Sequence, residues 1–345
     1  MKDALNERLA EVLDTHFDPR WGSPWWCDHA GKLGFDPRRE IVSVEDLPRL
    51  GAFPLAELAA RPLLHFIPLR YHDQRARLVT SETGGTTGAP KRSAFLDDEF
   101  TAAFVTPFIE AANLVQFPRD LNWLFIGPSG PHIIGKAARA CALAMGSLDP
   151  FMVDFDPRWA RTLHAGSLAR ARYLEHVVTQ ALDVLRTQDV GVLFATPPVL
   201  DALGARMEPA ERDCIRGVHL GGMRSEPDFL ARLQGSHFPN AVCLGGYGNS
   251  LMGLCPEVPT GETEPCYFAH GNRMIVSLED DGAGAPSHVR YHRLDCSMLL
   301  PNVMERDVAL PCDAPPKAIA HGFHARGLRD PQPPAGASGL GSGLY

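Results

Sequence analysis

The 345-residue chain lacks any excess of positive charge. Its formal net charge is −8 at pH 7, which argues against a nucleic-acid backbone as its main partner. No apolar run reaches the roughly 18 residues needed to cross a bilayer, which argues against a membrane-spanning protein. The eight cysteines are scattered singly, without a C-x-x-C pair, which indicates free thiols rather than a disulfide framework. We therefore expect a cytoplasmic protein with no nucleic-acid and no membrane partner.

Lysine is also scarce, and a lysine within a motif therefore carries more weight here than in a lysine-rich chain. The five lysines are Lys2, Lys32, Lys91, Lys136 and Lys317. The sequence has no G-x-S-x-G turn after a strand and no G-x-G-x-x-G loop between a strand and a helix. These absences disfavour a serine hydrolase and a Rossmann dinucleotide site. An apolar content of 45% and a charged content of 21% are typical of a soluble globular enzyme.

Short apolar runs that end in Gly or Pro predict buried strands. They cover residues 122–128, 190–197, 217–222 and 241–246. Between two of these runs, residues 168–188 carry apolar side chains at helical spacing. Strands that alternate with helices predict an α/β fold with a largely parallel sheet. At the N-terminus, Leu5, Leu9, Val12 and Leu13 predict an amphipathic helix.

The pattern changes after residue 246. Residues 274–278 and 288–294 predict strands separated by turn-rich segments, which gives a smaller β-rich part over about residues 247–330. Residues 331–345 consist mainly of Pro, Gly, Ser and Ala and predict a disordered tail. We therefore expect one domain over residues 1–330. Trp21, Trp25 and Trp26 are expected to pack the N-terminal segment onto it, rather than to form an aromatic-binding face.

The most informative segment runs from Ser81 to Lys91 and reads SETGGTTGAPK. Its glycines allow close approach of backbone N–H groups to a ligand, its threonines add hydroxyl donors, and Lys91 adds a positive charge. This combination suits a polyphosphate. The segment is not a Walker A loop, because Pro90 precedes the lysine and the G-x-x-x-x-G-K-[ST] spacing is absent. The alternative interpretation is a polar hairpin turn.

Five segments resemble, in chain order, motifs of the adenylate-forming superfamily, which includes acyl-coenzyme A ligases and nonribosomal peptide adenylation domains. Thr83 to Lys91 resembles the T-S-G-T-T-G-x-P-K phosphate loop. The other four are Gly127 to His132, whose His lies beside the acyl substrate in that family; Gly221 to Glu226, which borders adenine; Tyr247 to Ser250, which resembles Y-G-x-[ST]; and Tyr291 to Asp295, which resembles Y-x-x-x-D.

The resemblance implies a role for each matching residue. The residues that would bind the nucleotide are Thr83, Gly84, Gly85, Thr86, Thr87, Gly88, Gly221, Gly222, Tyr247, Gly248, Asn249 and Asp295. Asp295 would accept hydrogen bonds from both ribose hydroxyls. Lys91, His132 and Ser250 would act in catalysis, and His132 and Lys136 would line the acid pocket. For His132 a hydrogen-bonded structural role remains open, and for Lys136 a solvated position on a helix.

The flanking segments narrow the resemblance to one branch. Residues 43–47 and Glu305 to Asp307 are similar to phenylacetate–coenzyme A ligases. Gly22 to Trp26 and the short length are similar to a compact relative from phenazine antibiotic biosynthesis. The implied fold is a two-sheet αβαβα sandwich of mostly parallel sheets with a smaller β subdomain. The implied reaction uses ATP and Mg²⁺ to activate an aromatic, phenazine-type carboxylic acid as its acyl-adenylate.

The chain departs from the family pattern at three points. Leu251 stands where the family has a Glu that helps to hold Mg²⁺, and Gly322 to Gly327 is only a remnant of the hinge motif. The C-terminal lid domain is expected to be absent together with its lysine, because no lysine follows Lys317. Such losses favour an alternative in which the protein binds nucleotide or an aromatic metabolite without turnover, or works only with a partner enzyme.

A zinc site is the remaining alternative for the C-terminal part. Cys255, Cys266, His270 and Cys312 could supply four soft ligands for a tetrahedral site. Their spacing is irregular and includes no tight pair, so we expect ordinary free thiols and no bound metal there. The downstream acceptor of the acyl group stays open at this point: coenzyme A, an amine, a carrier protein or a reductase.

Overall fold

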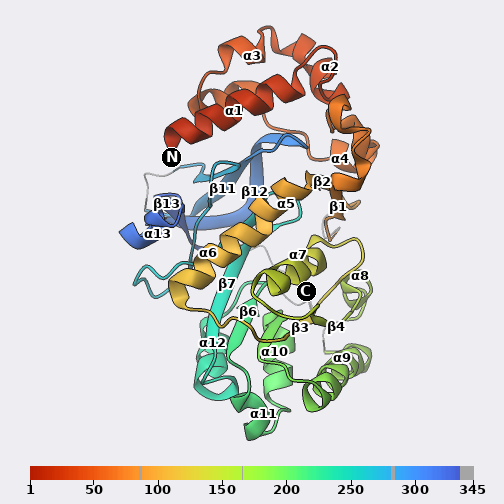
Figure 1. Cartoon of the computed structure of the whole chain (residues 1–345), viewed down its shortest axis with the longest axis vertical. Coiled ribbons are helices and arrows are strands. Elements are labelled where there is room, and N and C mark those ends of the chain that lie inside the picture. The colour runs from red at the N-terminus through yellow and green to blue at the C-terminus, as the bar shows by residue number, and fades with distance from the viewer. Residues whose placement is uncertain (85–87, 165, 281–283, 335–345) are drawn as a thin grey trace.

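A six-stranded sheet forms the centre of the lower half of the molecule (Figure 1). The computed structural model describes residues 1–84, 88–164, 166–280 and 284–334. The strand order is β4-β3-β5-β6-β7-β8, and all pairs are parallel except β7 with β8. The strands are β3 (Trp123–Ile126), β4 (Phe151–Val153), β5 (Val192–Ala195), β6 (Gly217–Leu220), β7 (Val242–Asn249) and β8 (Gly253–Pro256).

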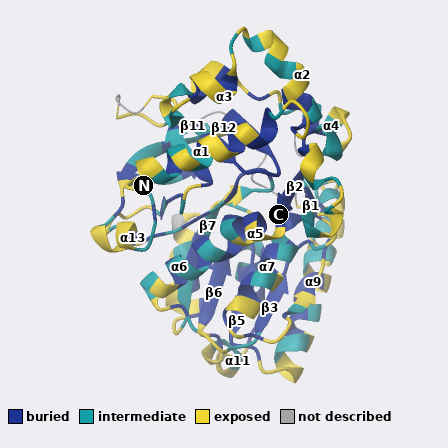
Figure 2. Ribbon diagram, turned by 45° about the horizontal axis from the view of Figure 1, so that its top comes forward, coloured by how far each residue is buried: buried dark blue, intermediate teal, exposed yellow. Residues whose placement is uncertain are grey.

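Both faces of this sheet are covered by helices, which explains the continuous apolar runs in its strands. Trp123 and Phe125 of β3 face a core shared with α6 (Thr106–Val115) and α7 (Ile133–Ala144). Leu124 and Ile126, the alternate residues, face a second core shared with α9 (Leu168–Thr187) and α10 (Pro197–Gly204). Figure 2 shows the strands as the most buried layer. The predicted parallel sheet and the predicted helix over 168–188 are confirmed.

The second large sheet lies in the part of the chain predicted to be smaller and β-rich. It has five strands in the order β10-β11-β12-β13-β9, and every pair is antiparallel. Among the described residues the six-stranded sheet is the one mostly parallel sheet, so the prediction of two mostly parallel sheets is wrong. The physical reason is that eight residues separate β10 from β11 and four separate β11 from β12, which is too few for a crossover helix between parallel strands. Its strands are β9 (Cys266–Tyr267), β10 (Met274–Leu278), β11 (Ser287–Leu294), β12 (Leu299–Asp313) and β13 (Arg326–Gln332).

The last strand extends the ordered part beyond the expected boundary at residue 330. β13 pairs with β12 up to Gln332, so two residues of the segment predicted to be disordered lie in a sheet. Residues 335–345 lie outside the described part of the chain. Between β12 and β13, the short helix α13 (Pro316–Ala320) packs against α6, and Phe323 is fully buried.

The N-terminal helices cover one face of the antiparallel sheet. Leu9, Val12 and Leu13 of α1 share a core with Leu294 and Leu299, which confirms the predicted amphipathic helix. Figure 1 shows this layer above β11 and β12. Its elements are α1 (Lys2–His16), α2 (Pro24–Leu33), α3 (Pro37–Glu40), η1 (Val44–Leu50), α4 (Glu57–Ala60), η2 (Leu63–His65), η3 (Leu69–Tyr71) and η4 (Arg75–Arg77).

A two-stranded hairpin links this layer to the parallel sheet. β1 (Leu78–Glu82) pairs antiparallel with β2 (Arg92–Leu96), and the Gly- and Thr-rich loop joins them. Gly85, Thr86 and Thr87, which are predicted to bind nucleotide, lie outside the described residues. The remaining short elements are α5 (Asp97–Phe100), η5 (Thr101–Val105), α8 (Pro157–Ala160), α11 (Pro209–Asp213), α12 (Pro227–Arg232) and η6 (Leu233–His237).

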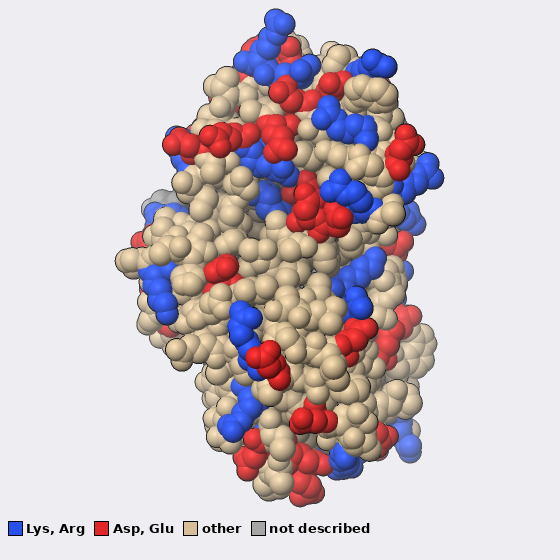
Figure 3. All heavy atoms as spheres, viewed as in Figure 1, with Lys and Arg blue, Asp and Glu red and all other residues tan. Residues whose placement is uncertain are grey.

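The surface carries both signs of charge. On the face shown in Figure 3, Lys and Arg side chains alternate with Asp and Glu side chains rather than forming one large field. All eight cysteines are described, and all are free thiols. Within the described ranges, no helix combines the length and the apolar character that crossing a bilayer requires.

Trp26 offers a test of the packing of the N-terminal layer. Ser23 caps α2 by accepting a hydrogen bond from Trp26 N, and Trp26 Nε1 donates to Leu299 O at 3.2 Å. Because Trp26 is 2% exposed, Trp26→Ala should lower the free energy of unfolding by about 3–5 kcal/mol in urea titrations. Trp21→Ala is the control: Trp21 is 46% exposed, and its removal should change stability by about 0.5 kcal/mol or less. Equal losses in both variants would contradict this assignment.

Candidate functional site

Several predicted site residues, namely His132, Gly221, Gly222 and Ser250, follow strands of the parallel sheet at its carboxyl edge, where open α/β sheets bind ligands. The loops that follow β3, β4, β6 and β7 all leave this edge. The β1–β2 hairpin is joined to it by a backbone hydrogen bond of 2.8 Å from Glu82 N to Pro131 O. The hairpin, His132 and the turn after β7 therefore meet in one place, although 168 residues separate Glu82 from Ser250.

The base of the phosphate loop is closed by hydrogen bonds between its two ends. Thr83 N donates to Lys91 O at 2.9 Å, and Lys91 N donates to Thr83 Oγ1 at 3.0 Å. The Thr83 hydroxyl thus shapes the loop by binding its own backbone. Both hydrogen bonds use backbone atoms of Lys91, so the Lys91 side chain takes no part in them.

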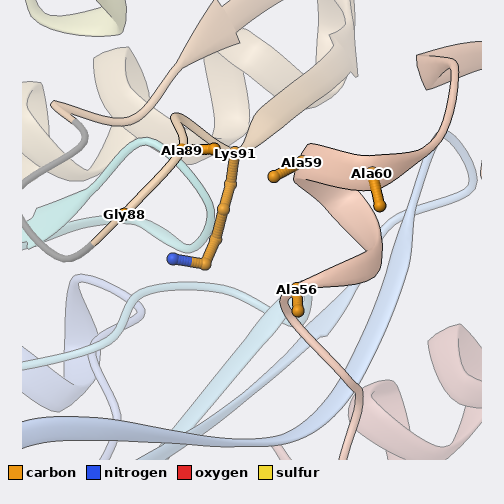
Figure 4. Close-up of a pocket in the computed structure, with 6 residues that line it drawn as sticks. All are labelled: Ala56, Ala59, Ala60, Gly88, Ala89 and Lys91. Atoms are coloured by element: carbon orange, nitrogen blue, oxygen red, sulfur yellow. The ribbon is translucent and has the colours of Figure 1, made fainter.

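Lys91 borders a cavity of about 370 Å³ beside the phosphate loop. Its other lining residues are small: Ala56, Ala59, Ala60, Gly88 and Ala89. Figure 4 shows the extended Lys91 side chain between the loop and the helix α4 that carries Ala59 and Ala60. No hydrogen bond or ion pair joins Lys91 Nζ to a described residue. A cavity with one cation and small apolar lining residues suits a ligand that carries an anionic group on an apolar body.

His132 and Lys136 both lie against the hairpin, at the start of α7. His132 precedes the helix and is 7% exposed. Burial, followed by the positive charge of Arg158, lowers the pKa of His132 below its ordinary value. Lys136 Nζ donates to Thr80 O at 2.5 Å, and burial lowers its pKa. Lys136 therefore fastens the hairpin to α7, and a role in substrate binding stays a prediction.

Ser250 connects the turn after β7 to the hairpin. Ser250 Oγ donates to Glu82 O at 3.3 Å, and Ser81 Oγ donates to Ser250 O at 3.5 Å. The turn is tight because Gly248 packs on the facing strand, where a Cβ atom would lie 2.0 Å from Gly253 O. Asn249 Oδ1 accepts hydrogen bonds from Leu251 N and Met252 N and so fixes the turn.

Two carboxylates lie beside Tyr247, and the sequence reasoning did not select them as site residues. Asp307 lies close enough to the Tyr247 hydroxyl to contribute to the raised pKa of Tyr247, and Glu305 accepts a hydrogen bond from Asn249 Nδ2. Burial, together with the charge of Asp307, raises the pKa of Glu305. Burial also raises the pKa of Asp307. In the described chain neither carboxylate forms an ion pair, so both can accept further hydrogen bonds. In the sequence, Glu305 to Asp307 indicated only a similarity to phenylacetate–coenzyme A ligases.

Asp295, which the resemblance assigns to the ribose, is buried and ion-paired in the structure, and its role in nucleotide binding stays a prediction. The residue is 0% exposed. Arg273 donates to both of its oxygens at 2.9 and 2.6 Å, and Arg293 donates at 2.5 Å. Burial opposes ionisation, but the two guanidinium groups outweigh it and hold the pKa of Asp295 below its usual range. Its carboxylate is thus committed to a buried ion-pair cluster.

The loop after β6 carries the predicted Gly221 and Gly222. Gly222 has φ of 81°, a left-handed conformation that glycine adopts without strain. Gly221 packs on the ring of Phe194. The loop is then held by Arg224, whose guanidinium donates to both oxygens of Asp330 at 3.0 Å. This contact ties the loop after β6 to β13 of the antiparallel sheet.

The cysteines and the histidine considered for zinc are Cys255, Cys266, His270 and Cys312. Among the described residues, no group of three His, Cys, Asp or Glu side chains lies close enough to hold a metal ion. Glu257, the carboxylate nearest in sequence to the missing family Glu, accepts a hydrogen bond from Gly245 N at 3.0 Å. It therefore binds the backbone of β7.

Comparison with known proteins adds a shared fold. No protein-family profile matches the sequence, and no curated protein matches it. The structure is similar to 2-hydroxyisobutyryl-CoA ligase in complex with 2-HIB-AMP and CoA in its thioesterification state, with a TM-score of 0.64 and 15% identity. For an open conformation of that ligase the TM-score is 0.65 and the identity is 13%. Each match covers 95% of this chain but only 66% and 68% of the two ligase chains, about two thirds. The likeness establishes an α/β fold shared with acyl-CoA ligases.

Asp295 can be tested as a structural residue. Asp295→Ala leaves two buried guanidinium groups unpaired and should lower the free energy of unfolding by about 3–5 kcal/mol. The ion pairs of Asp295 should stabilise the folded protein fully above about pH 3.9, the ordinary pKa of Asp in an unfolded chain. This stabilisation should disappear as the pH falls through the lower pKa of Asp295 in the folded protein. Asp149→Ala, which breaks an exposed pair with Arg139, should cost about 1 kcal/mol or less. A stable Asp295→Ala protein that loses only nucleotide binding would instead support the ribose assignment.

Proposed function

We propose that the chain binds ATP and a carboxylic acid and forms the acyl-adenylate with release of pyrophosphate. The observation that carries this proposal is the hydrogen-bonded junction of the phosphate hairpin with the turn after β7, through Ser250 and Glu82. It joins a loop suited to polyphosphate with a turn suited to a nucleoside. The fold shared with 2-hydroxyisobutyryl-CoA ligase supports it.

The proposed reaction is a displacement at the α-phosphorus of ATP. A carboxylate oxygen forms a bond to that phosphorus, the bond to the bridging oxygen of the β-phosphate breaks, and pyrophosphate leaves with the electron pair. Negative charge accumulates on the phosphates, so fixed cations lower the barrier. Lys91 supplies one such charge, His132 faces the acid, and Ser250 contacts the α-phosphate. Mg²⁺ enters as part of the substrate MgATP.

The nucleoside would lie along the turn after β7. In this proposal Tyr247 stacks on adenine, with Gly221, Gly222 and Gly248 allowing close approach. We assign the ribose hydroxyls to Asp307 and Glu305, because both carboxylates adjoin the Tyr247–Asn249 segment and retain free acceptor capacity. In this proposal Asp295 positions Arg293, which donates a hydrogen bond to Leu251 O at 3.0 Å in the turn after Ser250.

The acid is proposed to be aromatic, with phenazine-type carboxylates as the finer expectation. The cavity beside Lys91 has the small apolar walls that a planar ring would contact, and its volume of about 370 Å³ lies in the range of small-ligand sites. The acyl group would then pass to coenzyme A, an amine, a carrier protein or a reductase. We propose the cytoplasm as the compartment.

A second candidate function is nucleotide binding without turnover. It is favoured by Leu251, which stands where the family places a carboxylate, and by the burial of Asp295 in ion pairs. In this case the protein would bind ATP or an aromatic metabolite, or act only together with a partner enzyme.

ATP–pyrophosphate exchange separates the two functions. With benzoate, phenylacetate, phenazine-1-carboxylate and 2-hydroxyisobutyrate as acids, we expect exchange that depends on one of the aromatic compounds. ATP binding without exchange on any acid would favour the silent binder. Exchange with 2-hydroxyisobutyrate alone would overturn the aromatic assignment. Absence of both ATP binding and exchange would overturn the proposed function.

The ribose assignment has its own test on one strand. Asp307→Asn should weaken ATP and AMP binding in calorimetry about tenfold, because a charged acceptor of the sugar hydroxyls becomes neutral. Asp313→Asn, at the exposed end of the same strand and paired with Arg326 at 2.9 Å, should leave both affinities unchanged. Equal affinities for Asp307→Asn and wild type would remove Asp307 from the nucleotide site.

A further inference from the structure

Two arginines that no sequence motif selected hold the entrance of the phosphate loop. Arg158 lies in α8 and Arg161 directly follows it, in the loop region after β4. Arg158 Nη2 donates to Glu82 Oε2 at 2.8 Å and approaches Thr83 O at 3.5 Å. Arg161 Nη2 donates to Gly84 O. Both guanidinium groups therefore reach the first residues of the loop from the same side.

The backbone that carries these arginines is fixed independently of the loop. Asp156 caps α8 by accepting hydrogen bonds from Arg158 N and Trp159 N at 2.8 and 3.2 Å. Trp159 packs edge-to-face on Tyr173 of α9, with ring centroids 4.7 Å apart. The Tyr173 hydroxyl also accepts a hydrogen bond from Asp156 N at 2.9 Å. The two arginines project from an anchored turn, which lowers the entropic cost of their binding an anion.

The charges around the loop do not balance. Glu82 is the carboxylate paired with Arg158, and it also lies 3.4 Å from Arg92. Its hydrogen bond with Arg158 is the main cause of the lowered pKa of Glu82. Within the described ranges, no carboxylate lies within 4.0 Å of the Arg161 guanidinium or of Lys91. Among the described residues, Arg92 and Arg158 pair with Glu82, whereas Arg161 and Lys91 pair with no carboxylate. Two further carboxylates, Asp154 and Asp156, lie nearby and accept hydrogen bonds from Ser129 and from the backbone of α8.

Arg158 also carries a donor without a partner. Its Nε atom is buried and has no hydrogen-bond acceptor in the described structure. A buried donor of this kind costs free energy until an acceptor arrives. The guanidinium fork matches the geometry of phosphate oxygens, which accept two parallel hydrogen bonds. The excess charge and the open donor both call for a polyanionic ligand.

We propose that Arg158 and Arg161 form a polyphosphate-binding site together with Lys91, and that Glu82 is the internal counter-ion of this site in the free protein. The ligand is a pyrophosphate or triphosphate group, and the inference rests on the proposed function. On binding, phosphate oxygens replace Glu82 as acceptors for Arg158, while Arg92 keeps Glu82 neutralised. Arg161 adds its free donors to the terminal phosphate.

The test measures binding of inorganic pyrophosphate, ATP and AMP by calorimetry. Arg161→Ala and Arg158→Ala should each weaken pyrophosphate and ATP binding about tenfold to hundredfold, as expected for a charge-assisted hydrogen bond, and AMP binding less than about threefold. Arg161→Lys should give an intermediate loss, because it keeps the charge without the fork. Glu82→Gln should strengthen pyrophosphate binding, because it removes the competing acceptor.

Arg139→Ala serves as the control, since Arg139 forms an exposed pair with Asp149 at 2.8 Å. It should leave all three affinities unchanged. Wild-type pyrophosphate affinity in both arginine variants would overturn the inference and leave the proposed function standing. An equal loss for pyrophosphate and AMP, together with a lower melting temperature, would show that the arginines only hold the loop. Arginine-dependent pyrophosphate binding without any adenylate exchange would support the inference and count against the function. A wild-type protein that binds neither pyrophosphate nor ATP would overturn both.

Discussion

The structure depends on a buried cluster of charged residues that joins the N-terminal layer to the antiparallel sheet. Asp295 is paired with Arg273 and Arg293, and Arg8 of α1 lies 4.0 Å from it. Arg8 also pairs with Glu99 at 2.8 Å, and Glu99 accepts hydrogen bonds from the backbone that follows Asp295. Burying these groups is tolerable only because each has partners. The cluster therefore requires α1, α5, β10 and β11 to assemble together.

The same cluster sets the geometry of the candidate site. Arg293 donates to Ser93 Oγ at 2.8 Å and to Leu251 O at 3.0 Å, so it touches the base of the phosphate hairpin and the turn after Ser250 at once. Its guanidinium also lies over the ring of Phe95, 3.6 Å from the centroid. The separation between hairpin and turn is thus fixed by a core residue. Asp295 holds Arg293 in place, and it acts on the site through this arginine.

Sequence patterns predicted what local physics determines, such as the buried strands β3, β5, β6 and β7 and the helix α9. They missed β4, whose three residues are too short for a periodic signal, and they did not reveal that the second sheet is antiparallel. The ion pairs of Asp295 were missed for a related reason. A motif gives residue type and spacing, but the partner that decides the role, Arg273, lies 22 residues earlier in the chain. Arg158 and Arg161 stand in no motif, because only the fold brings them to the loop.

The two ends of the site differ in charge, and this difference bears on how a nucleotide would lie. At the hairpin, Lys91 and Arg161 have no carboxylate partner in the described part of the chain. At the turn after β7, Glu305 and Asp307 form no ion pair within the described residues, and burial raises the pKa of both although the charge of Arg306 lies nearby. ATP has the opposite arrangement, with an anionic tail and a sugar whose hydroxyls donate hydrogen bonds. Electrostatic complementarity favours one orientation, with phosphates on the arginines and ribose on the carboxylates, and the reverse orientation would place like charges together.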